Sequence, residues 1–408
     1  MAQNSSELGT AYRLEQFFGG IGKHLKDRRK KESFAMYAFG ILGDGERKSA
    51  EPIAARACGD EGRTAAVHQK LLYFLANSRW DDRAVRMDAT RYAIDAVQER
   101  EPITTWIIDD TGFLKQGTHS VGVQRQYTGS AGKVTNCQIG VSLAVASSSE
   151  QIAVDFELYL PELWIEDRAR RREARIPDDT PFKTKIELAL DMIKRGKEQG
   201  LPGDILLADS AYGDSTHFRN SVRELGFDFA VGVHSTLGVL RLDRNDRVNT
   251  KPQSVAEVVA ALPKKAFRRL TWRDGTKDKL CGRFAFVRVL TTHDDGTALC
   301  LREPQWLVAE WMDGDETPSK FVLTTLPRRM SKKQIVRLLK DRWRTERMYE
   351  DLKGELGLDH FEGRSFPGWH HHVSVVLTCY AFVVAERVRA FPPSASRARR
   401  HGTLSVAA

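Results

Sequence analysis

The stretch Ile103-Thr-Thr-Trp-Ile-Ile-Asp-Asp110 is a short run of strand-forming residues that ends in two carboxylates. Its β-branched and aromatic residues favour an extended backbone. A second run, Asp204-Ile-Leu-Leu-Ala-Asp209, is apolar without alternation, as expected of a strand covered on both faces. The two runs therefore predict strands that end in Asp110, with Asp109 beside it, and in Asp209.

The surrounding sequence predicts a mixed α/β order. The expected elements are a hairpin of 134–146 and 152–160, a helix at 183–197, a helix at 215–225, a strand at 227–233, a β-rich segment at 237–315 and a helix from Ser331 to Leu356. The order β-β-β-α-β-α-β, an insertion and then α is that of a ribonuclease-H-like domain. In this mixed sheet the strands of Asp110 and Asp209 are expected to be neighbours.

The domain organisation follows from the same pattern. Apolar residues recur at helical spacing from Arg13 to about Glu101, which predicts a small helical domain before the sheet. We expect an N-terminal helical DNA-binding domain at 1–101 and the first part of the ribonuclease-H-like catalytic domain at 102–235. A β-rich insertion at 236–318, the last catalytic part with the Glu346 helix at 319–390 and a basic tail at 391–408 complete the chain.

Composition limits the class of protein. Lys and Arg total 63 against 54 Asp and Glu, which gives a net charge of +9 and favours a polyanionic partner, although many basic proteins bind no nucleic acid. The five cysteines lie far apart, which indicates core thiols rather than a zinc ribbon or a disulfide framework. The longest nearly apolar run, Val373 to Ala385, is shorter than the ~20 residues of a membrane span. We therefore expect a soluble cytoplasmic protein with no membrane partner.

The carboxylates indicate metal chemistry. Asp110 and Asp209 on adjacent strand ends repel each other unless a cation lies between them, so the arrangement indicates a divalent metal with oxygen ligands. The alternative is that each aspartate only caps the turn after its strand. Glu346 is the third candidate, because at helical spacing it shares a face with Arg342 and Lys353. That stripe could also be a surface ladder of salt bridges.

Two metal ions held by such carboxylates can activate water or a 3′ hydroxyl and stabilise the leaving oxygen of a phosphodiester. Arg342 and Lys353 are candidate contacts to the DNA backbone beside the metals. Further candidate phosphate contacts form the densest basic run of the chain, although a solvated helix face is the alternative. These residues are Lys23, Lys26, Arg28, Arg29, Lys30 and Lys31. The cluster from Arg168 to Arg175 fits either a DNA contact or a solvated loop.

Three motifs resemble the transposases of the insertion-sequence-4 superfamily. They are Ile-Asp-Asp-Thr at 108–111, Leu-Leu-Ala-Asp-Ser-Ala-Tyr-Gly-Asp at 206–214, and the spacing of Arg342, Glu346 and Lys353. The segments 120–127 and 353–364 look closest to the 701 group of that superfamily. One departure is Leu339, which stands where the superfamily signature has a tyrosine; Tyr349 lies on the other side of Glu346 and is not expected to replace it.

The resemblance implies a DDE triad of Asp110, Asp209 and Glu346 that holds Mg²⁺ or Mn²⁺, two ions in all. It implies a transposase that acts, as a homodimer on double-stranded DNA, at the terminal inverted repeats of an insertion sequence and joins them to target DNA by cut-and-paste transposition. Two alternatives remain at this point. One is a ribonuclease-H-like metal-dependent nuclease that cuts without joining, and the other is a catalytically inactive DNA-binding relative.

Overall fold

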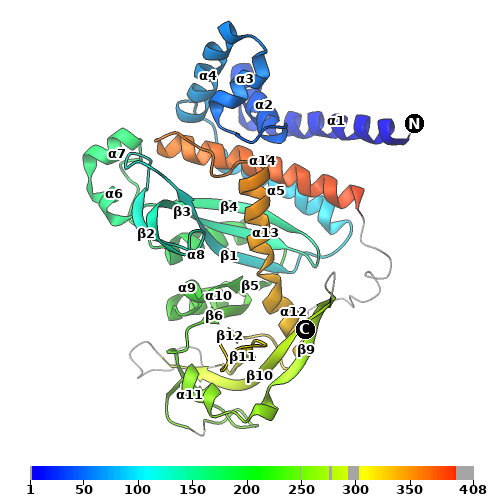
Figure 1. Cartoon of the computed structure of the whole chain (residues 1–408), viewed down its shortest axis with the longest axis vertical. Coiled ribbons are helices and arrows are strands. Elements are labelled where there is room, and N and C mark those ends of the chain that lie inside the picture. The colour runs from blue at the N-terminus through cyan, green and yellow to red at the C-terminus, as the bar shows by residue number, and fades with distance from the viewer. Residues whose placement is uncertain (1, 249, 275–277, 293–302, 392–408) are drawn as a thin grey trace. The chain divides into compact units, whose positions relative to one another are not determined.

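The computed structural model describes residues 2–248, 250–274, 278–292 and 303–391 (Figure 1). The chain divides into two compact units. Unit 1 contains residues 1–104, 110–189 and 345–408, and unit 2 contains residues 105–109 and 190–344. Strand β1 (Thr105–Leu114) thus contributes its first half to unit 2 and its second half to unit 1. The predicted basic tail at 391–408 lies outside the described residues except for Phe391.

Unit 1 begins with helices, as the helical spacing predicts. They are α1 (Ala2–Ile21), a 3-10 turn (Gly22–His24), α2 (Arg28–Leu42), α3 (Ala50–Cys58), α4 (Glu61–Ala76) and α5 (Asp82–Gln98). Asp27, Asp60 and Asp81 cap α2, α4 and α5, each accepting a hydrogen bond from a backbone N–H of the first turn. Local capping therefore fixes where these three helices begin.

The strands of unit 1 include the predicted hairpin. β3 (Lys133–Ala146) and β4 (Gln151–Tyr159) pair antiparallel. β3 also runs antiparallel beside β1, since Thr104 N donates to Ala146 O and Lys115 N donates to Asn136 O. The sequence analysis missed β2 (Gln124–Thr128), which pairs with β3. Its residues Gln-Arg-Gln-Tyr-Thr lack the apolar alternation that marks a half-buried strand.

The remaining helices of unit 1 follow the hairpin. They are α6 (Glu162–Glu166), α7 (Arg168–Ala174), α8 (Lys185–Glu198, which continues into unit 2), α13 (Arg344–Glu350), the π-helix η3 (Asp351–Glu355) and α14 (Phe366–Ala390). The sequence analysis did not predict α14, which packs against α2, α4, α5 and β4. Its residues are buried on nearly all sides, so it lacks the polar face by which an amphipathic helix is recognised.

Unit 2 contains the second predicted strand. β5 (Ile205–Ala208) runs parallel to the first half of β1 and to β6 (Asp228–Val233), which confirms that the strand of Asp209 neighbours β1. Two short helices, α9 (Ser210–Gly213) and α10 (Thr216–Glu224), connect β5 to β6. Trp106 of β1 is fully buried and donates from its indole nitrogen to Pro202 O at 2.7 Å.

The segment 237–315 is β-rich in its described residues, as predicted. It contains β7 (Gly238–Arg241), β8 (Gln253–Ser254), α11 (Val255–Ala260), a 3-10 turn (Lys264–Ala266), β9 (Arg268–Asp274), β10 (Lys279–Thr291) and β11 (Gln305–Trp311). β12 (Lys320–Thr324) pairs with both β11 and β6. The strands of unit 2 therefore follow the order β1, β5, β6, β12, β11, β10, β7, β8, with β9 also beside β10.

Two predicted boundaries are wrong. β1 does not end at Asp110 but continues to Leu114, because the carboxylates lie within the strand and not at a turn. The predicted helix from Ser331 to Leu356 is also not continuous. Ser331 begins α12 (Lys332–Asp341) with the expected capping box, but the helix breaks at Arg342 and Trp343. Ile335 of α12 and Met348 of α13 are both buried.

No helix of the described residues is long and apolar enough to span a membrane.

Candidate active site

Asp109 and Asp110 point to opposite faces of β1, because the strand continues through both residues. In unit 2, Arg342 Nη1 donates to Asp109 Oδ2 at 3.2 Å. In unit 1, Lys185 Nζ donates to Asp110 Oδ2 at 2.9 Å. Each carboxylate thus has a cation on its own side of the strand. Lys185 lies in the first turn of a predicted helix, and no local pattern marks it as a site residue.

Asp209 directly follows β5, as predicted, and is the N-cap of α9, where its carboxylate accepts from Ala211 N at 3.0 Å. The parallel register pairs Ile107 of β1 with Leu207 of β5. Carried two residues further, this register places Asp109 level with Asp209. Side chains at paired positions of neighbouring parallel strands share a face, so an extension of this register past its last pair would place Asp109, rather than Asp110, on the face of Asp209.

The backbone around Asp209 is closely packed. A Cβ added to Gly213 would lie 1.9 Å from Gly232 O, and a Cβ added to Gly232 would lie 2.9 Å from Ser210 N. These glycines allow α9 to pack directly on β6 and hold Asp209 at the strand end. Asp214 closes the segment, since its carboxylate accepts from His234 N at 2.8 Å and contacts the His234 ring.

Glu346 is exposed in the first turn of α13, in unit 1. The buried Thr345 next to it accepts a hydrogen bond from Gln151 of β4 at 3.0 Å. One turn later, the Tyr349 hydroxyl lies 2.6 Å from Ser142 Oγ of β3. These contacts fix α13 on the sheet of unit 1 and leave Glu346 on the solvent side. The Tyr349 hydroxyl is thereby held against the sheet of unit 1.

Lys353 is tied to the strand that carries Asp110. Its Nζ donates to Thr111 Oγ1 and to Gly112 O, both at 2.8 Å, and lies 5.3 Å from the centre of the Phe113 ring. Burial lowers the pKa of Lys353 below its ordinary value. Arg342 and Lys353, which the sequence presents as phosphate contacts, therefore both have protein partners. Their contact with DNA stays a prediction.

The three predicted catalytic residues come from both units. Asp110 and Glu346 belong to unit 1 and Asp209 belongs to unit 2. Within the described ranges, no group of three or more His, Cys, Asp and Glu side chains is close enough to hold a metal ion. The convergence of the triad therefore stays a prediction.

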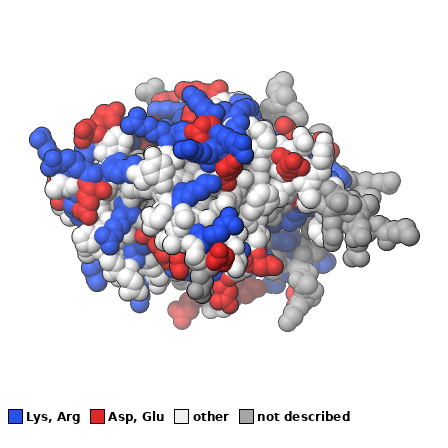
Figure 2. Space-filling view, turned by 90° about the horizontal axis from the view of Figure 1, so that it is seen from above, with Lys and Arg blue, Asp and Glu red and all other residues white. Residues whose placement is uncertain are grey.

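The basic run at 23–31 separates into paired and unpaired residues. Lys23 pairs with Asp88 at 2.5 Å, Arg28 with Glu32 at 2.8 Å and Lys30 with Asp27 at 3.1 Å. Lys26, Arg29 and Lys31 are exposed, and the described part of the chain gives them no ion pair. Figure 2 shows that Lys and Arg are spread over one face of the molecule with Asp and Glu between them. Only these three residues of the run are available to DNA without losing an internal ion pair.

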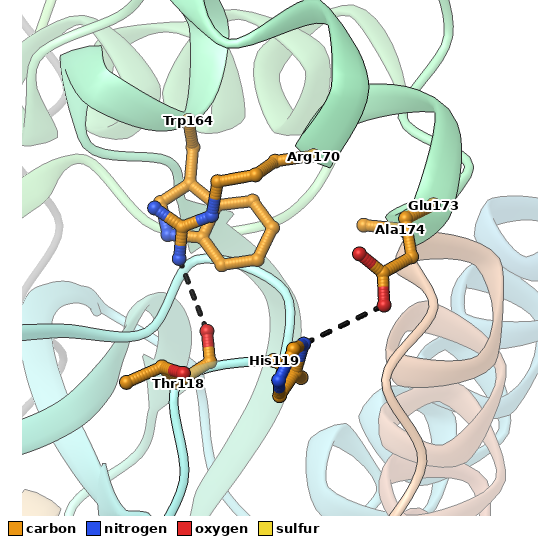
Figure 3. Close-up of a pocket in the computed structure, with 6 residues that line it drawn as sticks. All are labelled: Thr118, His119, Trp164, Arg170, Glu173 and Ala174. Carbon is orange, nitrogen blue, oxygen red and sulfur yellow. Dashed lines mark hydrogen bonds and ion pairs between the residues drawn. The ribbon is translucent and has the colours of Figure 1, made fainter.

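A pocket of about 410 Å³ lies beside α7 in unit 1 (Figure 3). It is lined by Thr118, His119, Trp164, Arg170, Glu173 and Ala174. The Arg170 guanidinium lies 3.9 Å from the centre of the Trp164 ring and donates to Thr118 O, while His119 pairs with Glu173 at 3.5 Å. Its one carboxylate is thus paired, and no predicted catalytic residue lines the pocket.

Some of the other arginines of the 168–175 cluster also donate hydrogen bonds within the protein. Arg171 donates to three backbone carbonyls, among them Pro177 O, and Arg175 donates to Asn77 Oδ1 at 2.7 Å. Arg168 and Arg172 are exposed. The contacts of Arg170, Arg171 and Arg175 therefore favour a structural role for these residues over a DNA contact.

Comparison with known proteins identifies the family. The family described as "DDE superfamily endonuclease" matches residues 16–279, well over half of the chain. The chain belongs to this family. The matched residues of this family member include Asp109, Asp110 and Asp209 and end before Glu346.

A curated relative agrees with the predicted resemblance to the 701 group. The chain is 30% identical over 237 residues to the "Probable transposase for insertion sequence element IS701" of Microchaete diplosiphon. The match covers 58% of this chain and 57% of the relative. The chain thus spans little more than half the length of that relative.

Among solved structures, the NurA nuclease from Sulfolobus solfataricus matches 61% of this chain and 78% of its own, with 9% identity and a TM-score of 0.27.

Proposed function

We propose that the chain is a transposase that binds the terminal inverted repeats of an insertion sequence and catalyses DNA cleavage and strand transfer. The observation that carries the proposal is that an aspartate of β1 and Asp209, directly after β5, come from adjacent parallel strands. The strand orders β4, β3, β1 in unit 1 and β1, β5, β6 in unit 2 support a ribonuclease-H-like catalytic domain. The segment 236–318 is then its β-rich insertion, and residues 1–101 are its helical DNA-binding domain.

The proposed metal ligands are Asp209, Glu346 and one aspartate of β1. The motif Asp-Thr selects Asp110, as the sequence resemblance implies, whereas the register with β5 favours Asp109. Carboxylate oxygens suit Mg²⁺ or Mn²⁺, so the donor set fits two such ions. When bound, these ions supply Lewis-acid stabilisation of the phosphate and an activated nucleophile.

The chain's own groups orient the carboxylates. Arg342 holds Asp109, Lys185 holds Asp110, and Ala211 N holds Asp209. Arg342 and Lys185 compete with a metal for the carboxylates, so they are expected to turn to DNA phosphate when the site is loaded. Exposed basic residues of the 23–31 run then contact the DNA backbone, and a homodimer brings two element ends together.

The decisive test uses the full chain, supercoiled plasmid that carries both element ends, and Mg²⁺. We expect wild type to excise the element and to join it to target DNA. Asp209→Asn and Glu346→Gln should each lower cleavage at least about a hundredfold, because each removes a metal ligand, while binding to end DNA persists.

Asp204→Asn is the matched control, because Asp204 is exposed just before β5 and no metal role is proposed for it. Cleavage without joining would identify a simple nuclease. End binding without cleavage by wild type would identify the inactive DNA-binding relative.

A further inference from the structure

An exposed patch lies on the hairpin of β2 and β3 in unit 1. Tyr127 and Val134 are cross-strand partners and are 63% and 54% exposed. Arg125 precedes Tyr127 by two residues, so it projects from the same face of β2. We call Arg125, Tyr127 and Val134 the hairpin patch. A large aromatic ring beside an aliphatic side chain and a cation suits a ligand with a flat apolar face and a negative charge.

The hairpin is held beside the strand of Asp110. Ser130, in the turn between β2 and β3, accepts from Gly112 N at 3.2 Å and lies 3.2 Å from Thr111 Oγ1. Lys353 Nζ donates to the same Ser130 Oγ at 3.4 Å. A Cβ at Gly112 would lie 2.1 Å from Thr128 Oγ1, so the hairpin rests directly on the β1 backbone. The turn is therefore fixed one to two residues beyond the catalytic candidate Asp110.

We propose that the hairpin patch is a stacking platform for an unpaired nucleobase at a DNA end. This inference rests on the proposed function and names the part of the DNA that the site recognises. The Tyr127 ring stacks on the base, since every base has an aromatic face and stacking tolerates any sequence. Arg125, which projects from the same face as Tyr127, holds an adjoining phosphate.

Charge argues for DNA over a second copy of the chain as the occupant. β2 is an edge strand of the unit 1 sheet and could in principle pair with another β2. Such a β2–β2 contact would leave the Arg125 guanidinium without an anionic partner, because the residues of β2 include no carboxylate. A DNA end instead supplies a phosphate for Arg125.

The experiment measures binding by the full chain, without metal, to two duplexes of one arbitrary sequence. One duplex is blunt, and the other has a short 3′ overhang whose first unpaired base is 2-aminopurine. We expect wild type to prefer the overhang and to quench its fluorescence by stacking. Tyr127→Ala should weaken overhang binding by ~5- to 100-fold and abolish the quenching, and leave blunt binding unchanged.

Tyr127→Phe should behave as wild type because it keeps the ring. Tyr73→Ala is the matched control, since Tyr73 is also 63% exposed but lies on α4. Equal wild-type affinity for both duplexes, or a Tyr127→Ala loss that is equal on both, would overturn the inference. So would a change in the sedimentation of the DNA-free chain in Tyr127→Ala, which would identify a second copy as the occupant.

The plasmid assay with Mg²⁺ separates this inference from the proposed function. Overhang preference without any cleavage would refute the transposase and leave the platform supported, whereas cleavage without overhang preference would refute the platform alone.

Discussion

Asp109 and Asp110 are neighbours in sequence on opposite faces of β1, Asp109 beside Arg342 and Asp110 beside Lys185. The Asp-Thr motif predicts that Asp110→Asn abolishes metal-dependent cleavage and leaves DNA binding largely intact. Cleavage of end DNA by Asp109→Asn and Asp110→Asn, each at several Mg²⁺ concentrations, checks this choice. If Asp110→Asn cuts normally and Asp109→Asn is inactive, the β5 register identifies the ligand and the motif assignment is wrong.

Lys353 provides a second test at the residue scale. Lys353→Ala removes hydrogen bonds from the partly buried Thr111 and Gly112 region, so we expect the free energy of unfolding to fall by about 1–3 kcal/mol. Urea unfolding measures this change, and the exposed Lys333→Ala serves as control. If Lys353 also clamps phosphate, the salt dependence of end binding becomes shallower by about one counterion. An unchanged salt slope would contradict the phosphate contact.

The sequence predicts the candidate residues better than their partners. Asp209 was placed correctly because a continuous apolar run marks β5, and Ser331 because a capping box is a local signal. The pairing of Asp110 with Lys185 could not be predicted, since 75 positions separate them and only the fold joins them. The contact of Ser130 with Gly112 could not be predicted either, because it depends on where the hairpin turn packs.

At the scale of the element, α14 contributes three consecutive buried histidines to unit 1. His372 donates from Nε2 to Gly357 O at 3.1 Å, and its Nδ1 accepts from the Tyr37 hydroxyl at 2.9 Å. His371 Nδ1 lies 2.7 Å from Leu75 O. Burial lowers the pKa of both His371 and His372 to about 4. These rings are therefore neutral parts of the core at neutral pH.

This burial predicts a loss of stability in acid. The unfolded chain takes up protons near the ordinary pKa of 6.5 and the folded chain only near 4, so stability is complete above pH 6.5 and falls as the pH drops toward 4. Each ring contributes up to about 3 kcal/mol to this fall. Urea unfolding of wild type and His372→Gln between pH 7 and 4.5 measures it. A variant that loses as much stability as wild type over this range would contradict the assignment; His119→Gln, exposed, is the control.

Helix α2 and the turn before it carry a prediction about DNA affinity. Replacing Lys26, Arg29 and Lys31 with Ala should lower the salt slope of DNA binding by about two to three counterions, because all three are exposed. The matched variant replaces Lys23, Arg28 and Lys30, which already pair with carboxylates, and should change the slope less. Equal slopes for wild type and the first variant would show that the run is only a solvated helix face.

Two structural features could not be predicted from the residues of the segments that form them. The helix break at Arg342 and Trp343 is invisible in a periodic pattern, because the apolar positions on both sides remain compatible with one helix. β2 is an edge strand, and its residues Gln-Arg-Gln-Tyr-Thr do not alternate between apolar and polar side chains. The sequence pattern therefore does not mark it as a strand. In both cases the structure depends on the surface that the segment covers rather than on the segment itself.

At the scale of the whole molecule, sequence order and spatial grouping differ. The predicted catalytic domain has two parts, at 102–235 and 319–390, and the other predicted domains are single segments; all of these boundaries stay predictions. The structure instead assembles unit 1 from three separate segments and divides β1 between the units at the Asp109–Asp110 bond. Periodicity and capping report only local neighbours. They could not show that α14, near one end of the chain, packs on α5, near the other.

This arrangement has a consequence for synthesis of the protein on the ribosome. Helices α2, α4 and α5 pack against α14, which is translated after the other described helices and strands. Complete packing of this core is therefore expected only after α14 has emerged, although nascent chains generally fold from their amino-terminal end. A premature stop codon before α14 is therefore expected to leave the faces of α2, α4 and α5 that pack on it uncovered, and to destabilise the truncated polypeptide.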